Sequence, residues 1–168
     1  MKYSLIIIIM FCILIAPAFA WGEVKIADNQ TEIAQLQHLL DSYHFKYQWQ
    51  DNVFDCVDMS AANYRFLKEH GYSPEIAIRK DPPRKDEHVY VFLPLKSGLV
   101  GVDTSIHRGA NLTASLGKVI TVLDMVQVCR TPEEVYAIDP RGPPVIHDEV
   151  IVPNNGTTNP VWPALSST

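Results

Sequence analysis

Three residues of the chain have the types and the order that thiol catalysis requires: Cys56, His88 and Asp103. A cysteine thiolate attacks carbonyl carbon, and a neighbouring imidazole can take the proton from the thiol. A carboxylate held against that imidazole fixes its tautomer and stabilises the imidazolium. The three residues therefore predict a Cys-His-Asp triad, provided that the fold brings them together.

Cys56 is expected in the first turn of a helix over residues 56–70. Asp55 is a favourable N-cap, Asp58 completes a capping-box pattern, and Gly71 stands where a left-handed residue ends a helix. The free N–H groups and the positive end of the helix dipole favour a thiolate at such a position. The carboxylates of Asp55 and Asp58 oppose it. The local pattern therefore makes a nearby base necessary.

His88 and Asp103 are predicted on the two strands of one hairpin. His88 opens the β-branched and aromatic run 88–93, turn residues follow, and Asp103 closes the return strand 99–103. Their positions differ by an odd number, which places both side chains on one face of an antiparallel pair with an even loop. With two residues at the tip they oppose each other directly, and with a slightly shifted register they are diagonal neighbours. Either register keeps them within reach of each other.

The segment 46–54, which leads into Cys56, is rich in aromatic and amide side chains. We expect backbone N–H groups at the helix start to hold an oxyanion, with side chains of this segment as helpers or pocket walls. Ordinary packing between helices is the alternative for each of them. The candidates, with one aromatic residue after the histidine, are Trp49, Gln50, Asn52 and Tyr90.

The remaining elements follow from periodicity, caps and turn residues. They comprise a helix over 29–44 capped by Asp28 or Thr31, a strand over 75–78, a charged loop over 79–87, one or two strands within 118–128, a helix from Thr131 that ends by Pro140, and an edge strand within 145–152.

The first twenty residues have the pattern of a secretory signal peptide. A basic start is followed by an apolar run from Leu5 to Ala16 and by small residues before Trp21. The run is short for a membrane span, which needs about 20 residues, and an uncleaved anchor is the alternative. We therefore predict a secreted or cell-surface protein, in contact with a membrane only if the segment is retained.

Removal of residues 1–20 leaves 148 residues with 13 Lys and Arg against 19 Asp and Glu, a net charge of −6. This length predicts one domain, residues 21–152, followed by a flexible tail over 153–168. An acidic domain without basic clusters argues against nucleic acid and anionic lipid as partners. There is no Gly-rich phosphate loop, CxxC pair or HExxH helix, so neither metal nor organic cofactor is predicted.

Two further features of an exported chain bear on the site. Cys56 and Cys129 are an even pair of cysteines, and a disulfide between them is the main structural alternative to a free nucleophile. Three glycosylation sequons begin at Asn29, Asn111 and Asn155. If they are used, those positions must lie at the surface.

The combination of FDCVDMS at 54–60, a helix ending in a Gly-Tyr turn, and His88 and Asp103 on successive strands resembles the transglutaminase-like branch of the papain-like cysteine proteases. The resemblance covers roughly residues 45–106. It implies an α+β fold in which N-terminal helices pack on an antiparallel β-sheet. Tyr90 stands where this family often has Trp, and Thr104 follows the acid where it often has Pro.

The resemblance implies that Cys56 is the nucleophile, His88 the general base and acid, and Asp103 the residue that orients the imidazole. Together with the residue types it predicts a hydrolase or acyl transferase for amide bonds, with a peptide, protein or peptidoglycan-like substrate. The superfamily also includes inactive binding modules, so an extracellular binding or cell-surface domain of the same fold is the alternative function.

Overall fold

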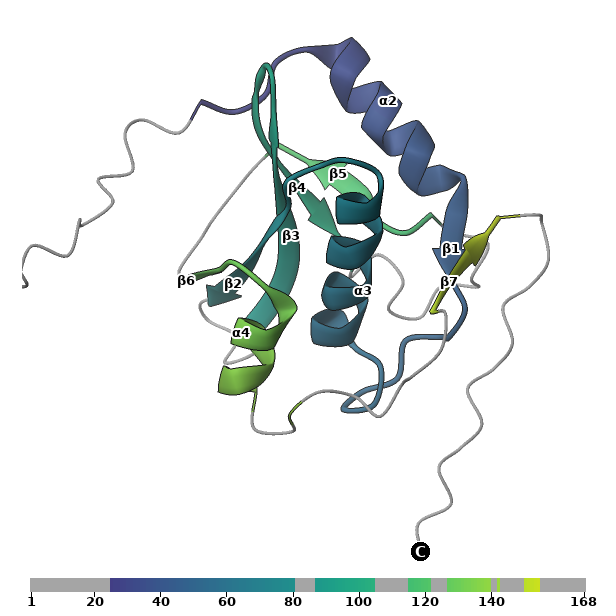
Figure 1. Cartoon of the computed structure of the whole chain (residues 1–168), viewed down its shortest axis with the longest axis vertical. Helices are drawn as coiled ribbons and strands as arrows, with labels where there is room; N and C mark the ends of the chain where they lie inside the picture. The colour runs from purple at the N-terminus through teal and green to yellow at the C-terminus, as the bar shows by residue number, and fades with distance from the viewer. Residues whose placement is uncertain are drawn as a thin grey trace, which may run out of the picture.

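The protein has a mixed helix and sheet architecture with two antiparallel sheets (Figure 1). The computed structural model describes residues 25–80, 87–104, 115–121, 127–139, 142 and 150–154. In chain order the elements are α2 Gln30–Asp41, β1 Tyr43–Phe45, α3 Cys56–Glu69, β2 Glu75–Lys80, β3 Glu87–Leu95, β4 Gly98–Asp103, β5 Lys118–Ile120, β6 Gln127–Cys129, α4 Pro132–Ile138 and β7 Ile151–Pro153.

The larger sheet has five strands in the order β5-β4-β3-β2-β6, with every pair antiparallel. Helix α3 lies across it, and α4 lies beside the first turns of α3 (Figure 1). The main core contains Met59 and Leu67 of α3 together with Ile76, Val91 and Val102 of the sheet, all fully buried. Burial of such side chains is worth about 1.5–3 kcal/mol each. This core fixes the helix against the strands that carry the site.

Helix α3 begins and ends as the sequence predicts. Asp55 is the N-cap, its side chain accepts from the Val57 N–H at 3.1 Å, and Asp58 Oδ2 accepts from the Asp55 N–H at 3.2 Å. At the other end Gly71 has φ +83°, and the Tyr72 N–H donates to the Leu67 carbonyl. These are a capping box and a Schellman ending, so the position of Cys56 at the first helical residue is confirmed.

The hairpin of β3 and β4 turns at Lys96 and Ser97, because Leu95 pairs with Gly98 and Val91 with Val102. The tip thus has two residues, for which direct opposition was predicted, but the pairing of Leu95 with Gly98 makes His88 and Asp103 diagonal neighbours instead. Glu32 of α2 holds the tip, with its carboxylate accepting from the Ser97 hydroxyl at 2.6 Å. The hairpin is therefore anchored at the end opposite the site.

Several predicted boundaries differ from the structure. The first helix ends at Asp41 with Asn29 as its cap, and Tyr43–Phe45 forms β1, which pairs with β7 in a separate two-stranded sheet. The predicted helix over 29–44 is thus too long, because its last residues form this strand pair instead.

The predicted loop 79–87 is shorter, since β2 continues to Lys80 and β3 starts at Glu87. Within 118–128 there are two strands, the second ending at Cys129.

Several predictions fall outside the described residues: the signal segment, the sequons at Asn111 and Asn155, and the tail from residue 155 onward. Asn29 is exposed, as its sequon requires.

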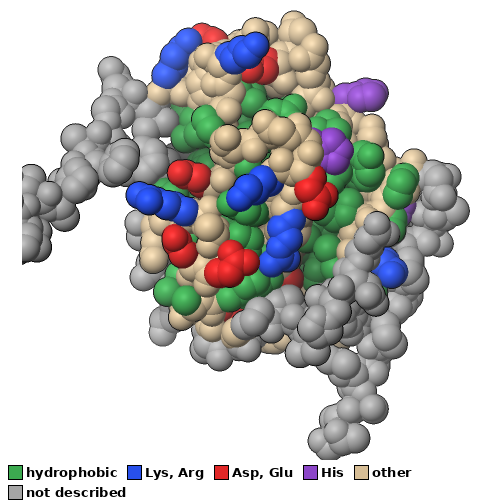
Figure 2. All heavy atoms as spheres, viewed as in Figure 1, with side chains coloured by type: hydrophobic (Ala, Val, Ile, Leu, Met, Phe, Trp, Pro, Cys, Tyr) green, Lys and Arg blue, Asp and Glu red, His purple; other side chains and the backbone are tan. Residues whose placement is uncertain are grey.

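No helix within the described ranges is long and apolar enough to cross a membrane. On the face drawn in Figure 2, basic and acidic side chains are interspersed and form no patch of one sign.

Candidate active site

The three predicted triad residues come from three elements that meet at one end of the larger sheet. Cys56 is the first residue of α3, His88 the second residue of β3 and Asp103 the last residue of β4. The capping box holds the helix start, and the hairpin register holds the other two. All three side chains are partly exposed, so the site is accessible from solvent.

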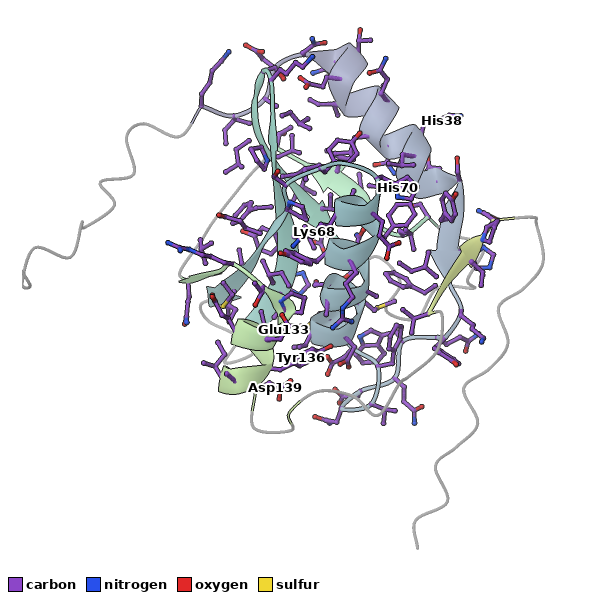
Figure 3. The ribbon with its side chains drawn as sticks, in the orientation of Figure 1. His38, Lys68, His70, Glu133, Tyr136 and Asp139 are labelled. Atoms are coloured by element: carbon purple, nitrogen blue, oxygen red, sulfur yellow. The ribbon has the colours of Figure 1, made fainter. Side chains whose placement is uncertain are left out.

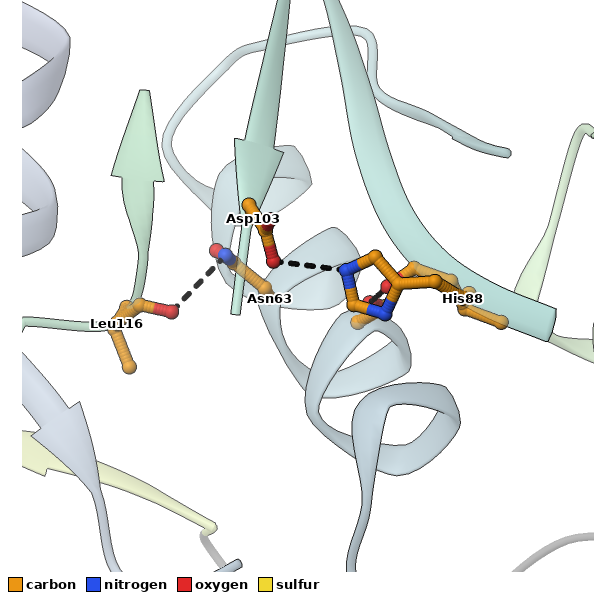
Figure 4. Close-up of polar contacts among 6 residues, drawn as sticks. Asn63, His88, Asp103 and Leu116 are labelled. Carbon is orange, nitrogen blue, oxygen red and sulfur yellow. Dashed lines mark hydrogen bonds and ion pairs between the residues drawn. The ribbon is translucent and has the colours of Figure 1, made fainter. Parts of the chain in front are cut away.

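His88 Nε2 lies 2.9 Å from Asp103 Oδ1, a contact drawn in Figure 4. An ionised carboxylate only accepts, so the proton of this hydrogen bond belongs to Nε2 and the imidazole donates it. The side chains are 22% and 23% exposed, which leaves the pair partly desolvated. Asp103 therefore fixes the orientation of the ring, as the sequence predicts.

The second interaction of His88 is with Cys56. Burial lowers the pKa of His88, but hydrogen bonds and electrostatic interactions with Asp103 and with Cys56 outweigh it and raise the pKa to about 9. Because Nε2 is engaged by Asp103, Nδ1 is the nitrogen left for the cysteine. One imidazole thus bridges a carboxylate and a thiol, and it is an imidazolium at neutral pH.

The raised pKa of His88 predicts a pH-dependent part of the stability. The folded state favours the charged ring, so the contribution is complete below 6.5, the ordinary histidine value, and is lost as pH rises through about 9. The difference corresponds to about 3 kcal/mol, which screening at a partly exposed group reduces to on the order of 2 kcal/mol. Urea unfolding at pH 6 and pH 10 of the wild type and of His88→Asn measures it. Equal pH dependence in both proteins would contradict the assignment.

Cys56 and Cys129 are both free thiols, so the disulfide alternative is not what the structure shows. Cys129 ends β6 and is 2% exposed. Burial and the charge of Glu134 raise the pKa of its thiol, which lowers its reactivity. The protein therefore contains a partly exposed cysteine at a helix start and a buried cysteine in the sheet.

The four pocket candidates have different positions. Gln50 and Phe54 pair across a tight turn, and Asn52 at its tip has φ +58°, a conformation that asparagine tolerates better than most residues. The amide side chains of Gln50 and Asn52 are exposed, and Trp49 packs on the core. Tyr90 stacks on His88, with ring centroids 6.0 Å apart.

Sequence reasoning missed two polar residues of α3 that touch the strands of the site. Ser60 Oγ donates to the Val89 carbonyl at 3.0 Å, and Asn63 Nδ2 donates to the Leu116 carbonyl at 3.4 Å (Figure 4). Both side chains are fully buried. Spacings of four and seven residues from Cys56 were the available signal, because they put all three on one helix face.

Helix α4 supports the outer side of α3. Burial raises the pKa of Tyr136 far above its ordinary value, the charge of Asp58 adds to this, and a hydrogen bond with Arg65 opposes it. Arg65 also pairs with Glu133 at 3.8 Å, and Figure 3 labels Glu133 and Tyr136 on α4, next to α3. This contact braces the helix that carries the cysteine.

Among the residues that the structure describes, no group of three or more His, Cys, Asp or Glu side chains is placed to hold a metal ion. Comparison of the chain with models of protein families, with curated proteins and with solved structures gave no match.

Proposed function

We propose that the protein is an exported, cysteine-dependent hydrolase or acyl transferase that acts on amide or peptide bonds. The observation that supports it best is the placement of His88, which is hydrogen bonded both to Asp103 and to Cys56. The order of the three residues, the helix-start cysteine and the antiparallel sheet agree with a papain-like core of the transglutaminase-like kind. Export rests on the signal-like first twenty residues.

In the proposed acylation step, Cys56 Sγ attacks the carbonyl carbon of the amide. An imidazolium facing the sulfur stabilises the thiolate that makes this attack. As the S–C bond forms, negative charge moves to the carbonyl oxygen. The C–N bond then breaks, and the His88 Nδ1 proton passes to the departing amine. The products are a thioester on Cys56 and a free amine.

In the second step a water molecule, or an amine in the case of transfer, attacks the thioester. His88 is now neutral and takes the proton of the attacking group while the C–S bond breaks. Cys56 returns to its starting state, and the product is a carboxylic acid or a new amide. The carboxylate of Asp103 stabilises the imidazolium in both steps without being protonated.

The developing oxyanion needs hydrogen-bond donors near Sγ. The Asp55 side chain occupies the backbone N–H groups of Val57 and Asp58 through the capping box. The backbone N–H of Cys56 itself is then the donor that remains at this helix start. The sequence predicted that several backbone N–H groups of this turn hold the oxyanion, and the capping box reduces them to this one. We propose that Trp49 or Gln50, in the 46–54 segment, supplies the second hydrogen bond to the oxyanion.

Thiol alkylation tests the proposal without a known substrate. We expect iodoacetamide at pH 7 to modify Cys56 at least tenfold faster than Cys129, because a thiolate is the reacting species and Cys129 is buried with a raised thiol pKa. Peptide mass mapping of the native protein after brief labelling measures both rates. His88→Asn should slow the Cys56 reaction at pH 7 and leave Cys129 unchanged. A native Cys56 that resists labelling contradicts a nucleophile.

A further inference from the structure

The face of α3 that begins with Cys56 carries a line of polar contacts to the strands of the site. Cys56, Ser60 and Asn63 are spaced by four and three residues, so they lie on one face of the helix. Cys56 contacts His88, Ser60 contacts Val89, and Asn63 contacts the segment just before β5. The first two contacts join the nucleophile helix to β3, which bears His88, and the third joins it to the segment that leads into β5, the strand that pairs with Asp103.

The contact of Ser60 lies directly next to His88. Its hydroxyl donates to the carbonyl of Val89, the residue that follows the histidine, and no part of the serine is exposed. A hydroxyl in the middle of a helix finds such a partner only where the strand backbone comes close. Ser60 therefore fixes the height of the His88 end of β3 along α3, one helical turn after Cys56.

The contact of Asn63 lies next to Asp103 through a short relay. Lys118 pairs with Asp103 across β4 and β5, and the carbonyl that accepts from Asn63 belongs to Leu116. Between them, Gly117 is pressed against β4, since a Cβ there would lie 3.0 Å from the Asp103 carbonyl and 2.8 Å from Val102 Cγ1. The same Cβ position is 3.5 Å from Asn63 Nδ2. Asn63 and the Asp103 carbonyl thus lie on the two sides of the small space that the missing Gly117 side chain leaves.

Asn63 makes fewer hydrogen bonds than we expect of a buried amide whose role is stability alone. Its Oδ1 is buried and has no hydrogen-bond partner among the described residues. A buried carbonyl without a partner costs free energy, and an apolar side chain of the same size avoids that cost. Stability therefore does not account for an amide at position 63. The feature that sets Asn63 apart is its position next to the segment that pairs with Asp103.

We propose that Ser60 and Asn63 are positioning residues that set the nucleophile helix in register with the base and acid strands. Ser60 holds the His88 strand and Asn63 holds the Asp103 end of β4, so the distances from Cys56 to both depend on them. Neither residue touches the reacting atoms. The inference rests on the proposed function, since it concerns the same three catalytic residues.

Ser60→Ala is the first test, because it removes one oxygen and leaves the packing nearly unchanged. We expect the pKa of His88 to fall from about 9 toward 6.5 as its contact with Cys56 loosens, and the alkylation rate of Cys56 at pH 7 to fall by about tenfold or more. NMR titration of the histidine ring and rate measurements across pH give both values. Asn63→Leu, of similar size, should act in the same direction by releasing the Asp103 end.

Thr131→Ala is the matched control. It also removes one hydroxyl hydrogen bond, that of the α4 N-cap, and should lower stability without changing the pKa of His88 or the pH profile of Cys56. If Ser60→Ala and Asn63→Leu lower only stability, as the control does, the two residues are structural and the inference is wrong. Neither readout uses substrate turnover. Absence of hydrolysis in the wild type would therefore count against the proposed function, and it would leave the result on positioning to stand separately.

Discussion

Replacement of Cys56 by alanine is expected to abolish amide hydrolysis, with kcat falling by about 10⁶-fold. In the proposed mechanism the sulfur is the atom that forms the acyl intermediate, and alanine offers no nucleophile in its place. The measurement is release of amine or acid from a panel of peptide and amide substrates, with the detection limit set by the uncatalysed rate. The variant should remain folded, because Cys56 is partly exposed and the Asp55 cap does not depend on its side chain.

Cys129→Ala is the matched control for that experiment. It removes the other described thiol, which is buried at the end of β6, and should leave turnover near the wild-type value with some loss of stability from the small cavity. Equal activity of Cys56→Ala and the wild type would overturn the proposed mechanism. Loss of activity in both variants together with unfolding would identify a stability effect, which circular dichroism detects directly.

Asp103→Asn is expected to lower kcat by about 10⁴-fold while keeping the fold. The carboxamide presents either an oxygen or an NH₂ group to the ring and carries no charge, so it neither fixes the tautomer nor stabilises the imidazolium. The pKa of His88 should fall from about 9 toward 6.5, because the hydrogen bond and the negative charge of Asp103 both raise it. The upper limit of the pH–rate profile, where the imidazolium is lost, should fall with it.

Asp28→Asn serves as its control, since Asp28 forms an exposed ion pair with Lys25, and such pairs contribute little. Its kcat and the pKa of His88 should match the wild type. Rates measured from pH 5 to pH 10, with ring titration by NMR, test both variants. An Asp103→Asn enzyme with unchanged kcat and unchanged His88 pKa would show that the hydrogen bond has no orienting role.

The site could be predicted from the sequence where the signals are local. The caps at Asp55 and Gly71 place Cys56 at a helix start, and the odd difference between His88 and Asp103 places them on one face of a hairpin. These inferences depend only on periodicity and turn chemistry, which act over a few residues. The choice between opposed and diagonal pairing depended on which two residues form the tip, and the Glu32 carboxylate that holds Lys96 and Ser97 comes from a distant helix.

The parts that the sequence could not predict are those set by distant contacts. Tyr43 and His44 end the predicted helix, yet together with Phe45 they form a strand that pairs with Ile151–Pro153, because tertiary pairing overrides a weak local preference. Ser60 and Asn63 are ordinary small polar residues until the strands are in place. Gly98 is similar. Residues 25–27 pass so close to it that a Cβ there would lie 2.5 Å from the Lys25 carbonyl.

The pairing of β1 with β7 has a consequence for how the chain reaches this structure. Tyr43 and Pro153 are about 110 positions apart, whereas partners within β2, β3 and β4 are fewer than twenty positions apart. Closing long loops costs more chain entropy and slows folding. During synthesis, the strands bearing His88 and Asp103 can therefore pair while residue 153 is still to be added. Assembly is expected to start from the hairpin of β3 and β4, with β1 and β7 pairing last.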